Sequence, residues 1–409
     1  MDFQYFQRDI EKFLQPWLAK REGILIYGAR QVGKSTLLKK ILDQYPESRY
    51  LSFDDPNVYT QALENPQGFL LQVSRGMKAI FIDEFQKVPG ITLAVKHLYD
   101  TRPDFPKIFM SGSISDSLIA GGDSMVGRVM RFPLYSLSFG EYLNARGIKT
   151  RLEIKSEILE QTTMLMGEFN HYLQNGGYPA TIYEDSQNLP IFFENLRRSF
   201  LEKDLLGRLR LGQIDNLPKL IVILAKRVGS PISYNSLGNE LGLQIKSIKN
   251  LLSILEYSYW IEIVRPISKY GGEFKNKFKV YFLDTGLCNF LASGSEIGSK
   301  LENCIFGSLK RNSFNSNFWH TYAGGEVDFI IEENGQTTAI EVKVGKMTQN
   351  KLPVSLKNYI VKYRPQRAVV VNQNHFGEQK IDRTQVYWLP AYVFAQLSKS
   401  DFAGWTKPK

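Results

Sequence analysis

Residues 23–38 read GILIYGARQVGKSTLL, a pattern that predicts a strand, a tight loop between glycines and then a helix. Residues 24–27 form a short apolar run, typical of a strand buried in a parallel sheet. From Gly28 to Ser35 the sequence fits Gly-x-x-x-x-Gly-Lys-Ser, in which glycines let successive backbone N–H groups turn toward phosphate oxygens. The N-terminus of the following helix also favours an anion. We therefore expect a phosphate-binding loop here.

This loop predicts ATP and Mg²⁺ as ligands. The Lys34 ammonium suits the β- and γ-phosphates, and the Ser35 hydroxyl suits Mg²⁺. The residues expected to surround the nucleotide are Gly28, Ala29, Arg30, Gln31, Val32, Gly33, Lys34, Ser35 and Thr36.

A second apolar run, residues 79–82, ends in Asp83 and Glu84 and has the form of a Walker B strand. We expect Asp83 to hold Mg²⁺ through water and Glu84 to polarise the attacking water. An acidic pair after an apolar strand is alone a weak signal for a Walker B strand. Here it follows a phosphate loop by about fifty residues, in a pattern of alternating strands and helices, and this spacing makes it strong evidence.

A third predicted strand, residues 107–110, runs into Ser111-Gly112-Ser113. Small polar residues at the carboxyl end of a strand face the ligand crevice of a doubly wound sheet. Ser111 or Ser113 is therefore expected to contact the γ-phosphate or the catalytic water, and we assign Ser111 to the catalytic set. The same serines also suit the N-cap of a following helix.

Residues 121–132 are glycine-rich and then basic. Arg128 is our candidate for an arginine that neutralises charge on the transferring phosphoryl group, either in cis or from a neighbouring subunit of a homo-oligomer. Arg131 is the competing candidate, and a structural role for either arginine stays open.

These segments together resemble a family of prokaryotic AAA+ ATPases that carry a C-terminal domain of unknown function. The resemblance rests on Gly28 to Ser35, Ile80 to Glu84, Ser111 to Ser113, and Gly127-Arg128 followed by PLYSLSFGEY at residues 133–142. The Leu-Ser-Phe-x-Glu-Tyr part is more specific than the phosphate loop, which many unrelated NTPases share. The resemblance runs along nearly the whole chain and implies an AAA+ ATPase domain in residues 1–150.

The middle of the chain, residues 151–285, is expected to form a helical lid and a winged helix. Residues 232–255 have helix-turn-helix spacing, with Gly242 at the turn. Polar residues of the second helix suit a nucleic-acid groove, and the basic, aromatic segment 269–279 suits phosphate contacts. The polar residues are Gln244, Lys246, Ser247, Lys249 and Asn250. Winged helices also serve as protein-interaction modules and as lids, so double-stranded DNA is one of several partners that the pattern allows.

The last part, residues 286–409, is expected to be a mixed α/β domain. Asn334-Gly335 between two strand patterns predicts a hairpin. Glu302, Asp328, Glu341 and Lys343 together resemble the PD-(D/E)xK nuclease fold. In that interpretation the acids chelate Mg²⁺ and Lys343, on the same strand face as Glu341, orients water. The ordinary alternative is a strand with solvent-facing Glu and Lys, and the fold also occurs as a contact module that does not cut.

Composition agrees with a globular cytoplasmic protein. The formal net charge of +10 makes an anionic partner such as DNA plausible, although excess lysine is also common on solvated surfaces. Two cysteines and four scattered histidines exclude a disulfide framework and a zinc site. No signal peptide or membrane-spanning segment is expected. We expect an α/β ATPase, and the alternatives are a nucleotide-switched DNA-binding or scaffold protein and an ATP-gated nuclease.

Overall fold

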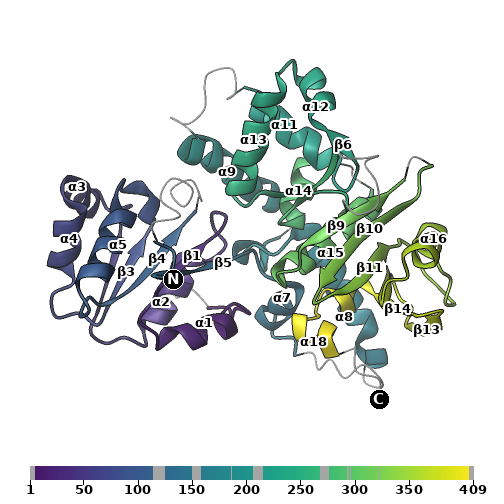
Figure 1. Ribbon diagram of the computed structural model, residues 1–409, viewed down its shortest axis with the longest axis horizontal. Helices are drawn as coiled ribbons and strands as arrows, with labels where there is room; N and C mark the ends of the chain where they lie inside the picture. Colours follow the sequence, from purple (N-terminus) through teal and green to yellow (C-terminus); the bar gives the residue numbers. More distant parts are fainter. Residues whose placement is uncertain are drawn as a thin grey trace. The chain divides into compact units, whose positions relative to one another are not determined.

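The computed structural model describes residues 5–113, 125–149, 158–185, 187–205, 215–267, 276–292, 294, 296–321 and 323–404 (Figure 1). It divides into two compact units. The first comprises Met1–Leu137, Tyr178–Ala180 and Tyr257–Tyr259, and the second comprises Ser138–Gly177, Thr181–Glu256 and Trp260–Lys409. The first division thus falls at residue 137 instead of 150, and the parts expected at 151–285 and 286–409 pack as one unit.

The first unit is built on a parallel sheet with the strand order β2-β3-β4-β1-β5. Its strands are β1 (Gly23–Tyr27), β2 (Ser48–Ser52), β3 (Ala79–Asp83), β4 (Lys107–Gly112) and β5 (Val129–Pro133). The helices are α1 (Glu11–Leu18), α2 (Lys34–Leu42), α3 (Pro56–Glu64), α4 (Pro66–Val73), α5 (Ile91–Thr101) and the short η1 (Phe85–Lys87). They cover both faces of the sheet (Figure 1).

Successive side chains of the central strands point to opposite faces of the sheet, so each face has its own core. Ile80 and Ile82 of β3 point into a core shared with α4 and α5. On the other face, Phe81 stacks on Phe109 of β4 with ring centroids 4.4 Å apart, and Tyr45, just after α2, packs edge-on against both rings. Because all strands are parallel, the loops at their carboxyl ends meet at one edge of the sheet.

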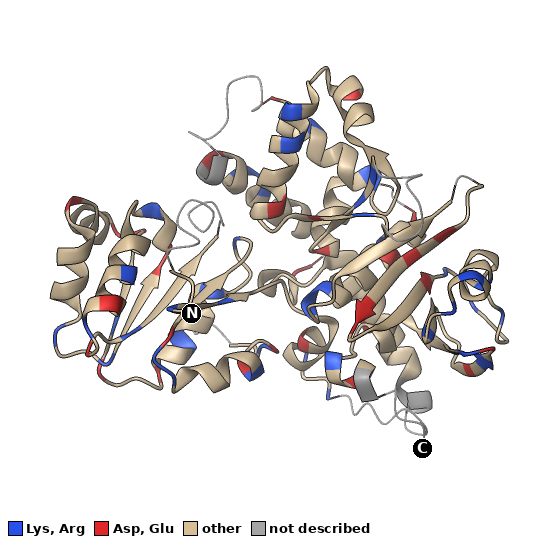
Figure 2. Ribbon diagram, in the orientation of Figure 1, with Lys and Arg blue, Asp and Glu red and all other residues tan. Residues whose placement is uncertain are grey.

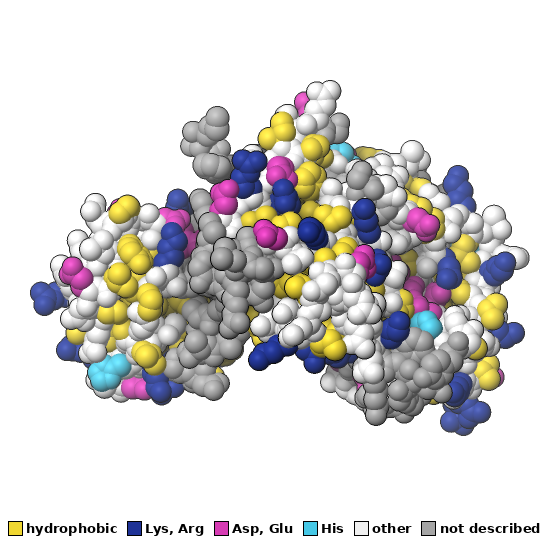
Figure 3. Space-filling model, turned by 90° about the horizontal axis from the view of Figure 1, so that it is seen from above, with side chains coloured by type: hydrophobic (Ala, Val, Ile, Leu, Met, Phe, Trp, Pro, Cys, Tyr) yellow, Lys and Arg dark blue, Asp and Glu magenta, His cyan; other side chains and the backbone are white. Residues whose placement is uncertain are grey.

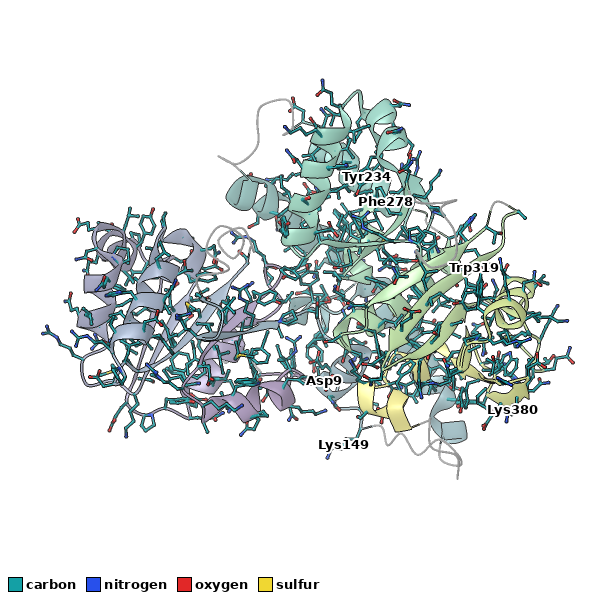
Figure 4. The ribbon with its side chains drawn as sticks, viewed as in Figure 1. Asp9, Lys149, Tyr234, Phe278, Trp319 and Lys380 are labelled. Atoms are coloured by element: carbon teal, nitrogen blue, oxygen red, sulfur yellow. The ribbon has the colours of Figure 1, made fainter. Side chains whose placement is uncertain are left out.

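The second unit begins with helices and a small antiparallel sheet of order β6-β8-β7. The elements are α7 (Phe139–Ala145), α8 (Ile158–Asn175), η3 (Pro179–Thr181, partly in the first unit), α9 (Leu189–Ser199), the π-helix η4 (Phe200–Leu205), α11 (Asn216–Lys226), β6 (Ile232–Ser233), α12 (Tyr234–Leu241), α13 (Ile245–Tyr257), β7 (Ile261–Val264) and β8 (Lys277–Phe282). Gly242 ends α12 at φ 65°, so the predicted turn between two helices is confirmed. Tyr234 of α12 packs on Phe278 of β8 with ring centroids 4.6 Å apart (Figure 4). Residues 268–275, the greater part of the expected basic loop, lie outside the described residues.

The rest of the second unit surrounds a mixed sheet of order β13-β14-β12-β11-β10-β9. Its elements are α14 (Thr285–Leu291), α15 (Ile297–Arg311), β9 (Ser316–His320), β10 (Glu326–Glu333), β11 (Gln336–Val342), α16 (Val354–Tyr363), β12 (Arg367–Asn372), β13 (Gly377–Ile381), β14 (Thr384–Pro390), α17 (Ala391–Phe394) and α18 (Lys399–Gly404). Asn334 and Gly335 both have positive φ, 51° and 75°, which confirms the predicted hairpin between β10 and β11. Leu356, Tyr359 and Ile360 of α16 belong to the core on one face.

Strand β8 is fastened to α15 by a buried side chain. Asn303 accepts a hydrogen bond from the backbone N–H of Phe282 at 2.7 Å and donates one to its carbonyl at 3.0 Å. This double contact fixes the register of β8 against the helix that carries Glu302. None of the helices in the described residues has a stretch long and apolar enough to cross a bilayer.

Candidate functional site

The loop after β1 has the backbone shape that its glycines predict. Gly28 and Gly33 have φ values of 155° and 98°. A Cβ atom on Gly28 would lie 2.0 Å from the carbonyl oxygen of Leu134, so only glycine fits there. The Lys34 ammonium donates hydrogen bonds to the carbonyls of Gly28 and Ala29 at 3.0 and 2.7 Å. The loop therefore delivers Lys34 and Ser35 to the N-terminus of α2.

Arg8, which precedes this loop by some twenty residues, stabilises it by hydrogen bonds. Its guanidinium donates hydrogen bonds to the carbonyls of Val32 at 2.8 Å and Tyr135 at 2.7 Å, and the side chain is buried. It thereby links the loop to the segment that follows β5.

Asp83 ends β3 and is held by two hydroxyl groups. Tyr50 of β2 donates a hydrogen bond to its Oδ2 at 2.7 Å, and Ser111 of β4 donates one to its Oδ1. Tyr50 also shares a hydrogen bond with Ser35, which connects the acid to the phosphate loop. Burial and the neighbouring Asp83 carboxylate raise the pKa of Tyr50, so this hydroxyl stays protonated and continues to donate.

Glu84 is held by a neighbouring amide. Its backbone is left-handed, with φ 56°, and its N–H donates to Oδ1 of Asp83 at 3.1 Å. Gln86 Nε2 donates to Oε2 of Glu84 at 2.5 Å and lies 3.2 Å from the Ser113 hydroxyl. Glu84 is thus fixed to the end of β4 through Gln86.

The structure brings together Lys34, Ser35, Asp83, Glu84 and Ser111 at the carboxyl ends of β1, β3 and β4. The donor set fits Mg²⁺, which prefers hydroxyl, carboxylate and water oxygens. The loop with its ammonium and helix N-terminus fits the phosphates of a nucleotide.

Arg128 does not join this group. Its carbonyl accepts a hydrogen bond from Gly23 N–H at 2.8 Å, at the amino edge of the sheet and so at the opposite end of β1 from the phosphate loop. Its guanidinium makes a bidentate ion pair with Asp100, at 2.5 and 2.9 Å, that raises the pKa of Arg128 and lowers that of Asp100. Arg128 therefore lies away from the phosphate loop of its own chain. Arg131 lies in the middle of β5, opposite Leu25. Part of this expected segment, residues 121–124, lies outside the described residues.

A second group of charged side chains lies in the C-terminal part of the second unit. Glu302 comes from α15, Asp328 from β10, Glu341 from β11, and Lys343 follows β11. Electrostatic interactions link Asp328 to both Glu302 and Glu341, and Lys343 Nζ lies 2.6 Å from Oε1 of Glu341. The structure therefore brings together all four residues that the sequence singled out. Acidic residues along this sheet are visible in Figure 2, and Figure 3 shows acidic side chains beside a histidine on the right of the view.

Sequence reasoning missed the centre of this group, which is Lys279 of β8. Its side chain is fully buried, and its Nζ lies 2.9 Å from Oε1 of Glu302, 2.5 Å from Oε1 of Glu326 and 3.8 Å from Oδ1 of Asp328. We call Lys279, Glu302, Glu326, Asp328, Glu341 and Lys343 the charged cluster. Glu326 was findable, because it precedes Asp328 by two residues on the same strand face. No sequence signal pointed to Lys279.

The charged cluster perturbs its own protonation equilibria. Burial lowers the pKa of Lys279, but the carboxylates of Glu302, Asp328 and Glu326 outweigh burial and raise it above its usual value. Burial and the charges of Glu302 and Glu341 raise the pKa of Asp328 well above its usual range. Burial also raises the pKa of Glu341, whose Oε2 has no hydrogen-bond partner among the described residues.

A nuclease of the PD-(D/E)xK kind needs Mg²⁺ among these carboxylates. Single oxygens of Glu302, Glu326 and Asp328 do lie within 4.8 Å of one another, a spacing that would admit an ion. The Lys279 ammonium, however, pairs with an oxygen from each of these three residues. A metal ion at these three residues would therefore have to share their carboxylates with the Lys279 ammonium.

Three family models match successive parts of the chain. The family model of an AAA domain matches residues 20–143. The first unit is AAA-like. Its parallel five-stranded sheet and phosphate loop confirm the expected P-loop NTPase fold. Two models of domains of unknown function match residues 166–297 and 297–392.

Proteins similar to most of this chain are described only as uncharacterised. One from Methanocaldococcus jannaschii is 22% identical over 87% of this chain and 82% of its own length. One from Haemophilus influenzae is 23% identical over 89% of this chain and 92% of its own length. One from Mycobacterium tuberculosis is 23% identical over 89% of this chain and 79% of its own length.

Solved structures with some likeness include the Aeropyrum pernix Orc1 protein in complex with DNA, at 12% identity and a TM-score of 0.31 over 70% of this chain and 92% of that chain. Domain III of the Thermotoga maritima replication initiation protein DnaA gives 13% identity and a TM-score of 0.27 over 47% of this chain and 94% of that chain. These TM-scores are too low to support an argument about function.

Proposed function

We propose that the AAA-like unit binds ATP with Mg²⁺ and hydrolyses it. The single observation that carries this proposal is the hydrogen-bonded path from Ser35 through Tyr50 to Asp83, which joins the phosphate loop to the acidic pair. A phosphate loop alone needs no such link, whereas hydrolysis needs the metal-holding groups and the water-activating acid beside the phosphates.

Each residue then has a role of its own. Lys34 and the N–H groups from Gly28 to Thr36 hold the phosphates, and Ser35 with Asp83 would hold Mg²⁺, which supplies positive charge to the phosphate oxygens when bound. A carboxylate oxygen of Glu84 accepts a proton from the attacking water, and Ser111 keeps Asp83 in place.

Two variants test the proposal. Lys34→Ala is expected to abolish nucleotide binding, because it removes the cation that faces the phosphates. Glu84→Gln is expected to keep binding and to lose turnover by a factor of about 10² or more, the scale of a missing general base. Binding of a fluorescent ATP analogue and release of phosphate are measured on both variants. Undiminished hydrolysis in both would reject the assignment.

A second function is favoured by the surface of α13. We infer that this helix presents polar side chains to duplex DNA as the recognition helix of a winged helix. Gln244, Lys246, Lys249 and Asn250 are exposed, and a hollow of about 570 Å³ lies where α12 meets α13, lined in part by Asn235, Asn239, Gln244 and Lys246. Exposed lysines and amides of this kind contact phosphates and base edges.

Fluorescence anisotropy with a labelled duplex tests the DNA proposal. Replacing Lys246 and Lys249 by Ala is expected to weaken binding and to reduce the salt slope by about one to two, since about one counterion is released per phosphate contact. Replacing Lys357, an exposed lysine of α16 in the C-terminal part, by Ala is the control. An unchanged salt slope in the double variant would remove α13 from the interface.

Turnover with and without DNA separates a motor-like ATPase from a slow nucleotide switch. Stimulation by DNA supports coupling between the two units. Negligible turnover combined with nucleotide-dependent DNA binding supports a switch. The mass of the protein in solution, recorded in the same experiment, gives its oligomeric state.

A further inference from the structure

Lys279 occupies an unusual position for a lysine. Its side chain has no exposed surface, whereas the other lysine of the charged cluster, Lys343, is about half exposed at 48%. A buried ammonium is costly unless it is paired and hydrogen-bonded, so its surroundings must supply several acceptors. Glu302 and Glu326 lie at 2.9 and 2.5 Å from it, and Asp328 lies at 3.8 Å.

Lys279 and a divalent ion would draw on the same three carboxylates. Glu302, Glu326 and Asp328 offer one oxygen each within a span of 4.8 Å. Mg²⁺ binds oxygens at about 2.0–2.1 Å, so an ion held by these groups would lie directly beside the ammonium. Two cations that close together repel strongly in a buried site. The ammonium and a metal ion therefore compete for one place.

Hydrogen bonds next to Lys279 fix strand β8 to α15. Tyr281, two residues on and on the same face of β8, donates a hydrogen bond to Oε1 of Glu302 at 2.6 Å. The backbone of Phe282 makes two hydrogen bonds with the Asn303 side chain on α15. These contacts hold the part of β8 that carries Lys279 against α15.

We propose that Lys279 is the resident cation of the charged cluster, among three carboxylates that could otherwise hold a divalent metal ion. The cluster excludes Mg²⁺ and instead joins β8 of the small antiparallel sheet to α15 and β10 by buried ion pairs. The C-terminal part of the chain then works as a contact module and does not cut DNA. This inference is independent of ATP hydrolysis by the first unit.

Manganese titration of the nucleotide-free full-length protein tests the inference by calorimetry and by thermal unfolding. Wild-type protein and Asp328→Asn are expected to give the same Mn²⁺ response, because the cluster takes no metal in either. Lys279→Met is expected to gain a Mn²⁺ site at least about tenfold tighter than any in the wild type, since the carboxylates lose their cation. That site should disappear in the double variant with Asp328→Asn.

Lys277→Met, on the same strand and partly exposed, is the matched control and is expected to behave like the wild type. If Lys279→Met is unstable without metal, recovery of its melting temperature by Mn²⁺ is the expected result, since a bound ligand stabilises the folded state. The inference is overturned if the wild type binds Mn²⁺ in a manner that Asp328→Asn abolishes. It is also overturned if Lys279→Met acquires no Mn²⁺ response.

Discussion

The hydroxyl of Tyr50 on β2 donates a hydrogen bond to Oδ2 of Asp83 at the end of β3, at 2.7 Å. These strands are neighbours in register, with Tyr50 opposite Phe81 and Ser52 opposite Asp83. Because Tyr50 also bonds Ser35, one side chain orients the two residues expected to hold Mg²⁺. The tyrosine is thus a positioning residue for the proposed nucleotide site.

Tyr50→Phe is expected to lower ATP turnover by about tenfold, equivalent to about 1.4 kcal/mol, because Asp83 loses one of its two hydroxyl donors. The Mg²⁺ concentration that gives half-maximal turnover should rise as well, which a purely structural role would not produce. Tyr45→Phe is the control, since its hydroxyl donates to the Leu18 carbonyl away from Asp83. Equal effects of the two variants would argue against positioning by Tyr50.

Gln86 is expected to control the orientation of Glu84. Its amide joins the Glu84 carboxylate to Ser113, so Gln86→Ala should free the acid and lower turnover by about 10-fold or more while nucleotide binding is retained. Ser113→Ala removes only the far end of the link and should have a smaller effect. Single-turnover phosphate release with bound nucleotide measures both, and a larger loss in Ser113→Ala would contradict this order.

Arg128 is expected to have no direct contact with nucleotide in its own chain. Arg128→Ala should leave the turnover of a monomeric protein unchanged, because the arginine lies at the amino edge of the sheet and pairs with Asp100. If copies of the chain complete each other's sites, Arg128→Ala will lose turnover in the oligomer. Mixing it with Lys34→Ala would then restore part of that turnover, and phosphate release on the mixture measures this directly.

The free energy of unfolding is expected to depend on pH through the protonation of Asp328. Its pKa is raised in the folded state, mainly by burial and then by Glu302 and Glu341, so the folded state holds the proton more tightly than the unfolded state. The contribution of Asp328 to stability is therefore greatest at low pH and declines as pH rises above the ordinary pKa of an aspartate. Each unit by which the pKa of Asp328 in the folded state exceeds its pKa in the unfolded state lowers the free energy of unfolding by about 1.4 kcal/mol, once the pH is above both values.

Asp328→Asn removes this titration. Its destabilisation relative to the wild type should shrink as pH rises from about 4 to about 8, because the wild type alone loses the favourable protonation. Urea midpoints across this range provide the measurement. A destabilisation that instead grows with pH would mean that the carboxylate is stabilised in its charged form.

Much of the proposed nucleotide site could be predicted from the sequence because it is local. The glycines at 28 and 33, the lysine and serine after them, and the acids that end β3 all follow from short patterns whose chemistry needs those residue types at that spacing. Tyr50 and Gln86 were not predictable, since a tyrosine in a strand and a glutamine after an acidic pair have many ordinary uses. Their partners depend on strand order, which short patterns do not encode.

The case of Arg128 shows the same limit. A basic residue after a glycine-rich segment suggested an arginine beside the phosphates. In its own chain it instead lies just before β5, and β5 runs parallel to β1, so the residue is at the far end of the sheet from the loop after β1. The direction of β5 and its pairing with β1 decided where Arg128 lies.

The sequence by itself determined the phosphate loop, the turn at Gly242 and the hairpin at Asn334-Gly335, because each depends on backbone conformations that a few neighbouring residues select. It also placed Glu302, Asp328, Glu341 and Lys343 in one group. Only the tertiary structure decided which cation lies at the centre of that group. Lys279 reaches those carboxylates from a different sheet, and the balance between burial, repulsion and ion pairing exists only once β8, α15 and β10 have packed together.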